Sequence, residues 1–315
     1  MPPSPATVIV LRRVPFSETS LVLTLFSREF GKIQGLAKGA RRPKSAFEGG
    51  FDLLGIYRIV FLPRSGESLQ LLTEGKLVER FRPEAAGLRG LFAGYYLAEL
   101  LDSFTPEMGP HAEVFDLAVL TLRQLQTGAR AEWATLRFEV ALLRALGHLG
   151  RFDACSVCGR VIPWQEPARL TETGGGLTCN RCWRPSIRGL SITGAVRKAI
   201  HDLSRVVSSA EVEGRQPVAE ESTSEDKLAL PGRPTGQSVA LTAAANAEES
   251  SAPASPAFGL EREVNHSYEL ADVYPQVRGL VSHWVCHLLG RKPRLFPFLE
   301  KMGFFAKPAG RATTQ

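Results

Sequence analysis

The segment TVIVLRRVPFSETSLVLTLF, residues 7–26, opens a succession of short β-rich runs that decides the fold of the N-terminal part of the chain. Similar runs follow at residues 30–36, 53–62, 68–73 and 76–81. Glycine, proline and polar turn residues separate most of them, as they do between strands. Such a series of short strands suits a small closed barrel such as the OB-fold, and an SH3-like barrel fits the pattern nearly as well.

Helical spacing of the apolar residues replaces this pattern after Pro83, a residue type that is favoured in the first turn of a helix. The spacing predicts helices over residues 84–103, 111–126 and 131–146, the last closed by a glycine. A shorter helix is expected from residue 193 to 203. Further helical spacing returns near Tyr268 and runs through Leu289, interrupted by Pro275.

The overall composition is that of a globular protein with a basic surplus. The 315 residues carry a net charge of +6 with a pI near 9.2, which favours nucleic acid or another anionic partner. No apolar run approaches the ~18 residues of a membrane span, and the N-terminus lacks a signal-peptide pattern, so we expect a cytoplasmic protein. Residues 208–260 hold eight acidic and three basic side chains with few apolar ones, which predicts disorder. The positive charge is therefore concentrated in the remaining chain.

Four of the five cysteines form two C-x-x-C pairs, Cys155 with Cys158 and Cys179 with Cys182, with twenty residues between the inner members. Two such pairs supply the four thiolates of a tetrahedral Zn²⁺ site. A redox dithiol is the main alternative, but it comes as a single pair. Four protein ligands leave the ion no open position, so a structural zinc is predicted rather than a catalytic one. The spacing leaves open whether the module binds nucleic acid or only braces the fold.

Basic side chains gather in the predicted barrel, most densely in the loop KGARRPK that runs from Lys38 to Lys44. Cations in such a loop can follow a phosphate backbone, and neighbouring phenylalanines can stack on bases. The candidate DNA-binding residues are Arg12, Arg13, Lys38, Arg41, Arg42 and Lys44, and the candidate stacking residues are Phe16, Phe26, Phe30 and Phe47. A solvated charged loop beside core aromatic residues is the alternative.

Catalytic patterns are missing from the sequence. It has no phosphate-binding GxxxxGK[ST], no GxSxG and no compact carboxylate cluster for Mg²⁺. His283 and His287 have the spacing of a zinc-binding HExxH, but Trp284 replaces the glutamate, which favours helix packing. We therefore expect a protein that is not an enzyme and has no catalytic residues.

The order of these features resembles the RecO family of bacterial recombination mediators. The motifs are KGARRPKS at residues 38–45, FDACSVCG at 152–159 and LLGRKPRLFPFLEKM at 288–302. The start of the family's barrel is matched at Val10, Leu11, Glu18, Ser20, Phe26, Ser27 and Gly31. The resemblance covers the chain except for residues 208–260, which look like an acidic insertion.

The resemblance implies a function in DNA repair, DNA recombination and the DNA damage response. An OB-fold would bind single- and double-stranded DNA, and the protein would anneal complementary strands at the nucleoid. Partners would be RecR and the C-terminal tail of the single-stranded-DNA-binding protein SSB, and RecA would be loaded indirectly onto SSB-coated single strands. The match of the basic loop transfers DNA contact to its cations. Zinc binding rests on the cysteines, because not every family member retains them.

The predicted fold class is therefore α+β and multidomain, with an N-terminal OB-fold β-barrel and a helical domain carrying an inserted four-cysteine zinc module. The expected parts are a DNA-binding OB-fold (1–82), a helical domain (83–150), the zinc module (151–187), a helical segment (188–207), a disordered acidic linker (208–262), a C-terminal helical segment returning to the helical domain (263–305) and a tail (306–315). The alternative functions are a protein-interaction adaptor with a structural zinc site, or a zinc-containing nucleic-acid enzyme.

Overall fold

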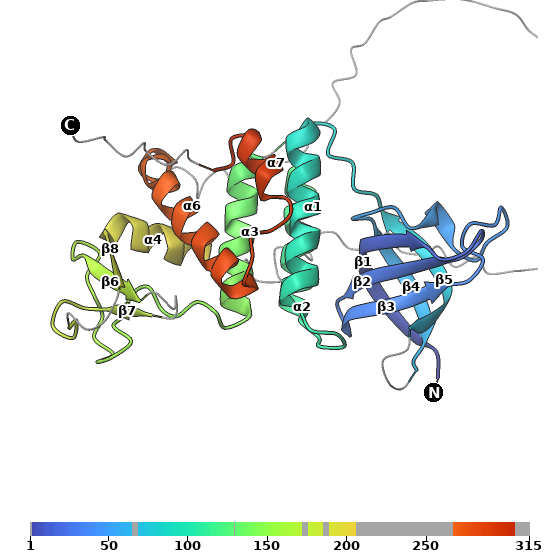
Figure 1. Cartoon of the computed structure of the whole chain (residues 1–315), viewed down its shortest axis with the longest axis horizontal. Coiled ribbons are helices and arrows are strands. Elements are labelled where there is room, and N and C mark those ends of the chain that lie inside the picture. Colours follow the sequence, from blue (N-terminus) through green and yellow to red (C-terminus); the bar gives the residue numbers. More distant parts are fainter. Residues whose placement is uncertain are drawn as a thin grey trace, which may run out of the picture.

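The computed structural model describes residues 2–64, 69–128, 130–171, 176–184, 189–205 and 267–305. Three parts follow one another along the molecule (Figure 1): a β-barrel at one end, a group of helices in the middle and a small three-stranded sheet at the other end. The segment 208–262, expected to be disordered, and the tail 306–315 lie outside the described residues.

Five strands close the barrel in the order β1-β2-β3-β5-β4. The pairing of β3 with β5 is parallel, and the other neighbours are antiparallel. The strands are β1 Ser4–Pro15, β2 Leu21–Ser27, β3 Gly31–Ala37, β4 Ile56–Leu62 and β5 Gln70–Glu79, with a 3-10 turn, η1, at Glu48–Gly50. Together with the helices and the cysteine cluster, this OB-like barrel confirms the predicted α+β multidomain fold.

The runs expected as separate strands at residues 68–73 and 76–81 form the single strand β5, so that division was wrong. Gly75 lies inside β5, and a Cβ there would come within 2.8 Å of the Phe51 ring and 3.1 Å of the Phe47 ring. A glycine stands at this position because aromatic rings pack on the backbone, not because the chain turns.

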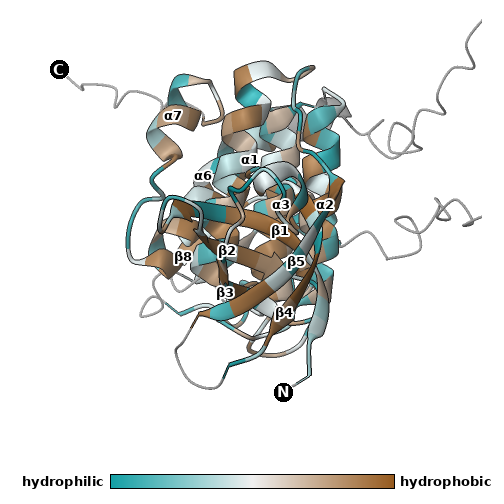
Figure 2. Cartoon of the chain, turned by 90° about the vertical axis from the view of Figure 1, so that its right-hand side faces the viewer, coloured by the Kyte–Doolittle hydropathy of each residue, from teal (hydrophilic) through white to brown (hydrophobic). Residues whose placement is uncertain are grey.

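Residues 8–11 of β1 and nearly all of β2 are buried on both faces, which explains the nearly continuous apolar sequence of these stretches. Val8 and Leu25 point into the barrel core, whereas Ile9 and Phe26 belong to the core shared with the helices. The Phe26 ring lies 6.2 Å from that of Phe115 on the second helix. Figure 2 shows much of the barrel strands in the brown of hydrophobic residues, as this double burial requires. The barrel and the helices thus share an apolar interface.

Two cations of the N-terminal segment hold the barrel against the helices. The Arg28 guanidinium donates two hydrogen bonds to the carboxylate of Asp116, at 2.9 and 3.0 Å. The Lys32 ammonium donates to the backbone carbonyl of Asp102 at 2.6 Å. Because these two side chains contact the helices, they are separate from the exposed cations of the loop after β3.

The helices are α1 Gly87–Phe104, α2 Ala112–Gln126, α3 Ala131–Ala145, α4 Gly194–Leu203, α6 Ser267–Leu289 and α7 Phe296–Lys301. The first begins at residue 87 rather than 84, because Gly87 has a φ of +57° and the chain before it is not helical. Pro83 therefore precedes the helix instead of entering its first turn. Within the described residues, no helix combines the length and the apolar character needed to cross a membrane.

Helix α6 runs through Pro275 without a break, so the expected interruption was wrong. Pro275 is exposed, while Val277, Arg278 and Val281 on the following turns are buried. Contacts of this buried face with α3 and α4 keep the helix continuous despite the missing N–H group. The part of the chain after residue 267 thereby lies against the central helices, and α7 lies against α1.

A small antiparallel sheet follows α3, in the order β7-β6-β8. Its strands are β6 Ala168–Thr171, β7 Leu177–Thr178 and β8 Gly189–Ile192. Thr193 caps the next helix, α4, because its hydroxyl accepts a hydrogen bond from the N–H of Val196 at 3.4 Å. The sheet is thereby joined directly to a helix of the central group.

Candidate functional site

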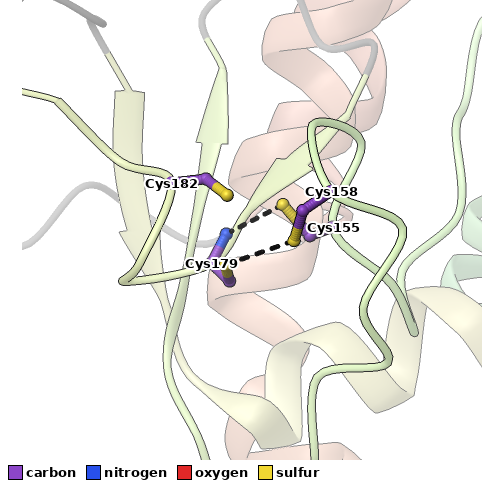
Figure 3. A group of neighbouring side chains, drawn as sticks. All are labelled: Cys155, Cys158, Cys179 and Cys182. Carbon is purple, nitrogen blue, oxygen red and sulfur yellow. Dashed lines mark hydrogen bonds between the residues drawn. The ribbon is translucent and has the colours of Figure 1, made fainter.

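Four cysteine sulfur atoms converge beside the small sheet (Figure 3), all within 4.8 Å of one another. Cys155 and Cys158 come from the turn after α3, and Cys179 and Cys182 from the turn after β7. A compact set of four thiol donors could hold a metal ion. The fifth cysteine, Cys286, is half-buried on α6, where burial raises the pKa of its thiol.

The turn that carries the first cysteine pair is fixed by its own backbone. The N–H of Cys155 donates to the carbonyl of Arg160 at 2.8 Å, and the N–H of Gly159 donates to the carbonyl of Cys155 at 2.9 Å. Gly159 has a φ of +70°, which glycine adopts without steric strain. A side chain at this position would strain the turn that aims both sulfurs at one point.

The second turn repeats this arrangement and contacts the first. The N–H groups of Cys182 and Trp183 both donate to the carbonyl of Cys179 at 3.0 Å. The N–H of Cys179 donates across to the sulfur of Cys155 at 3.4 Å, and the sulfurs of Cys158 and Cys179 are 3.9 Å apart. Metal–sulfur bonds of ~2.3 Å in a tetrahedron place sulfurs about 3.8 Å apart, so the donor set fits a thiolate metal site.

The thiols differ in their tendency to ionise. Burial opposes ionisation of Cys155, but backbone N–H groups of Cys179 and Cys158 outweigh it and lower the pKa of Cys155 to about 6. The hydrogen bond with Cys158, together with burial, raises the pKa of Cys182 to about 12. Thiolates so close together repel one another, and a cation among them removes that repulsion. A cation held among the four sulfurs would therefore make ionisation of all four thiols easier.

Arg197 on α4 fastens the cysteine-bearing segment to the helices. Its side chain is fully buried. The guanidinium donates at 2.7 to 3.2 Å to the backbone carbonyls of Phe152, Ile162, Pro163 and Glu166. Burial lowers the pKa of this arginine, and the four carbonyl oxygens stabilise its charge. Arg197 was not among the predicted site residues; the signal for it in the sequence is a cation on the apolar face of the helix expected from residue 193 to 203.

The cations Lys38, Arg41, Arg42 and Lys44 stand in the loop after β3, and all four are exposed. The N–H of Arg41 donates to the carbonyl of Thr19 at 3.0 Å, which fastens this loop to the β1–β2 turn. Within the part of the chain that the structure describes, no carboxylate forms an ion pair with any of the four. We call the segment 38–44, which carries these four cations, the basic loop.

The other two predicted cations, Arg12 and Arg13, lie on β1 immediately after a shift in its register with β2. Both are exposed. Arg13 donates to the backbone carbonyl of Gly50 at 3.1 Å, so part of its hydrogen-bonding capacity is used within the barrel. Neither residue belongs to the basic loop, which follows β3.

A pocket of about 370 Å³ opens between the basic loop and the β1–β2 turn. Its walls are formed by Phe16, Thr19, Ser20, Leu36, Lys38, Gly39 and Arg42. The Phe16 side chain is 66% exposed. The structure therefore brings two cations of the basic loop and one aromatic face to a single hollow.

The other phenylalanines proposed for stacking do not reach this surface. Phe26 and Phe47 are buried, so the expectation that they offer stacking faces was wrong. Phe30 is half-buried and contacts the ring of Phe61, with the ring centroids 5.2 Å apart. Phe26 lies on β2, which is covered on both sides, whereas Phe47 lies next to η1 and packs against the Phe51 ring, with the ring centroids 5.4 Å apart. Strand alternation alone did not reveal this burial.

Comparison with known proteins gives two matches to family models. The model described as "Recombination protein O N terminal" matches residues 1–81, and that described as "Recombination protein O C terminal" matches residues 87–216. The chain is 36% identical over 292 residues to the DNA repair protein RecO of Rhodopirellula baltica, which covers 92% of this chain and 97% of that protein. It is 33% identical over 176 residues to the protein of that name from Anaeromyxobacter sp. strain K, covering 56% and 69%. The relative from Exiguobacterium sibiricum is 29% identical over 203 residues, covering 63% and 80%.

Proposed function

This chain belongs to the RecO family of DNA repair proteins, and on that premise we propose that it is a DNA-binding recombination mediator whose basic loop contacts the DNA backbone. It binds single and double strands and anneals complementary single strands. Annealing requires no bond to be broken, because neutralising the phosphates and holding two strands close together is sufficient. No catalytic residues are assigned.

The observation that carries this proposal is the basic loop itself. Its four exposed cations have no ion-pair partners in the described residues, and a backbone hydrogen bond fixes the loop in place. Cations held in this way release counterions from DNA when they meet phosphates, which gives affinity without base specificity. Binding should therefore tolerate any sequence.

The partners that we propose follow from the family. RecR would form a complex with this chain, the acidic C-terminal tail of SSB would recruit it to coated single strands, and RecA would be loaded there as a consequence. This work would take place on nucleoid DNA in the cytoplasm. The net positive charge of the chain suits an acidic tail and nucleic acid alike.

The metal that we propose for the four cysteines is Zn²⁺ in a structural role. Four thiolates complete its tetrahedron and leave no position for substrate or water. When bound, the ion would supply the charge that keeps all four thiols ionised. The position of this site at the end of the molecule opposite the barrel (Figure 1) places it away from the basic loop.

The test replaces Lys38, Arg41, Arg42 and Lys44 together by alanine and measures the DNA affinity of the full chain from low to moderate salt. We expect weaker binding and a flatter dependence of log affinity on log salt, by roughly 0.7 for each lost phosphate contact on single strands. The control is the double variant Arg58→Ala with Lys76→Ala. It removes two exposed cations that lie opposite each other on β4 and β5 and do not line the pocket. An unchanged salt slope in the quadruple variant contradicts the placement of the DNA contact.

A further inference from the structure

The pocket beside the basic loop brings together an aromatic ring, two hydroxyl groups and two cations. The β1–β2 turn contributes Phe16 together with the hydroxyl-bearing residues Thr19 and Ser20, and the basic loop contributes Lys38 and Arg42. An aromatic face recognises the face of a base, and the cations and hydroxyl groups recognise a phosphate. A volume near 370 Å³ lies at the small end of the range for ligand pockets, which suits a ligand the size of one nucleotide.

The pocket is preformed, because backbone hydrogen bonds fix both of its walls. In the β1–β2 turn, the N–H of Phe16 donates to the carbonyl of Ser20 at 3.0 Å. In the basic loop, the N–H of Arg42 donates to the carbonyl of Gly39 at 3.0 Å. The link from Arg41 to Thr19 at 3.0 Å joins the two walls. A ligand that enters this pocket therefore loses little affinity to loop ordering.

Gly39 allows the basic loop to fold back on itself. Its φ is +72°, and the Arg42 side chain lies 3.4 Å from the place where a Cβ of residue 39 would stand. A residue other than glycine would strain the turn, because this φ lies in the left-handed region. The geometry thus positions Arg42 over the backbone of the loop, at the pocket wall.

A base inside a duplex stacks on both of its neighbours and cannot offer a face to Phe16, whereas an unpaired base can. We propose that this pocket holds one unpaired nucleotide, with its base against Phe16 and its phosphate on Lys38 and Arg42, and that it makes the barrel favour single strands over duplex. This inference rests on the proposed function and adds strand selectivity to it. The other cations of the basic loop, Arg41 and Lys44, contribute to both kinds of DNA.

The experiment compares the full-length Phe16→Ala variant with the unaltered protein on three labelled probes of equal length: an oligo-dT single strand, a duplex and an abasic deoxyribose-phosphate strand. We expect about ten-fold weaker binding to oligo-dT, since one stacked base contributes ~1–3 kcal/mol, and unchanged binding to the duplex and the abasic strand. Phe16→Tyr keeps the aromatic face and should bind oligo-dT as the unaltered protein does.

Phe298→Ala is the matched control, because Phe298 is a half-exposed ring on α7, outside the pocket. Equal losses on all three probes, or no loss on oligo-dT, overturn the unpaired-nucleotide pocket. The double variant Lys38→Ala with Arg42→Ala distinguishes failure of the pocket assignment from failure of the proposed function. If that double variant weakens binding to every probe while Phe16→Ala changes nothing, the pocket assignment fails and the proposed function stands. If the quadruple basic-loop variant changes no binding at all, the proposed function fails too.

Discussion

A buried ion pair joins residues that are far apart in the sequence. Arg278 on α6 donates to the carboxylate of Glu139 on α3, with one of the bonds measuring 2.7 Å, and the two side chains are 2% and 0% exposed. The Tyr96 hydroxyl donates to the same carboxylate. Burial raises the pKa of Tyr96 well above its ordinary value, so this hydroxyl stays protonated and remains a donor. The pair fixes the position of α6 against the central helices.

Removing one partner of this pair should lower the stability of the fold. Glu139→Gln leaves a guanidinium buried without a counter-charge, and we expect the free energy of unfolding to fall by about 3–5 kcal/mol in urea denaturation. The double variant Glu139→Gln with Arg278→Met removes the stranded charge as well and should recover part of the loss. Asp153→Asn, which breaks the exposed pair with Arg151, is the control and should cost less than about 1 kcal/mol. Equal costs for the buried and the exposed pair would count against this interpretation.

At the scale of the element, the first turn of α3 carries a carboxylate, Glu132, that stabilises the helix N-terminus and binds two arginines. Glu132 accepts hydrogen bonds from Arg89 at 2.8 Å and from Arg130 at 3.1 Å. Burial alone would raise the pKa of Glu132, but its backbone N–H group and the charge of Arg89 lower it overall. Since a negative charge near a helix N-terminus is favourable, the ionised carboxylate stabilises α3.

The stability that Glu132 provides should depend on pH. Its pKa is lower in the folded than in the unfolded chain, so the contribution is complete above the unfolded value near ~4.3 and disappears as the pH falls through the folded value. Glu132→Gln should lower the free energy of unfolding by about 1 kcal/mol at pH 7, with a difference that shrinks below about pH 4. Glu113→Gln is the control, because Glu113 lies in the first turn of α2 and forms no ion pair among the described residues. If Glu132→Gln lowers the free energy of unfolding equally at about pH 7 and below about pH 4, the ionised carboxylate is not the cause of the loss.

At the scale of the whole molecule, local patterns were predictable and long-range packing was not. The cysteine cluster was predictable because two C-x-x-C pairs at this separation are typical of one metal site, and the exposed cations of the basic loop lie in one short stretch of sequence. The contacts of Arg197 and of the Glu139–Arg278 pair depend on segments that meet only in the folded chain. The sequence pattern also could not show that β2 is covered on both sides, which buries Phe26 and leaves Phe16 as the exposed ring at the pocket.

The arrangement of the three parts suggests a division of work between the two ends. The barrel carries the basic loop and the pocket, and the cysteine cluster lies beyond the central helices (Figure 1). Apolar packing and ion pairs join the barrel to the helices, and Arg197 joins the cysteine-bearing segment to α4. On the function that we propose, a metal ion held by the four cysteines would maintain one end of the fold, and the barrel would contact the DNA at the other.

The measurement that tests this account most directly is the rate at which the full chain anneals complementary strands coated with a single-strand-binding protein. The quadruple basic-loop variant is compared with a metal-site variant, Cys158→Ser with Cys182→Ser, at a temperature where both are folded by circular dichroism. We predict that the basic-loop variant anneals at least about ten-fold more slowly, whereas the metal-site variant keeps its rate and shows a lower melting temperature. A basic-loop variant that anneals as fast as the unaltered protein, or a metal-site variant that loses annealing while remaining folded, would contradict the account.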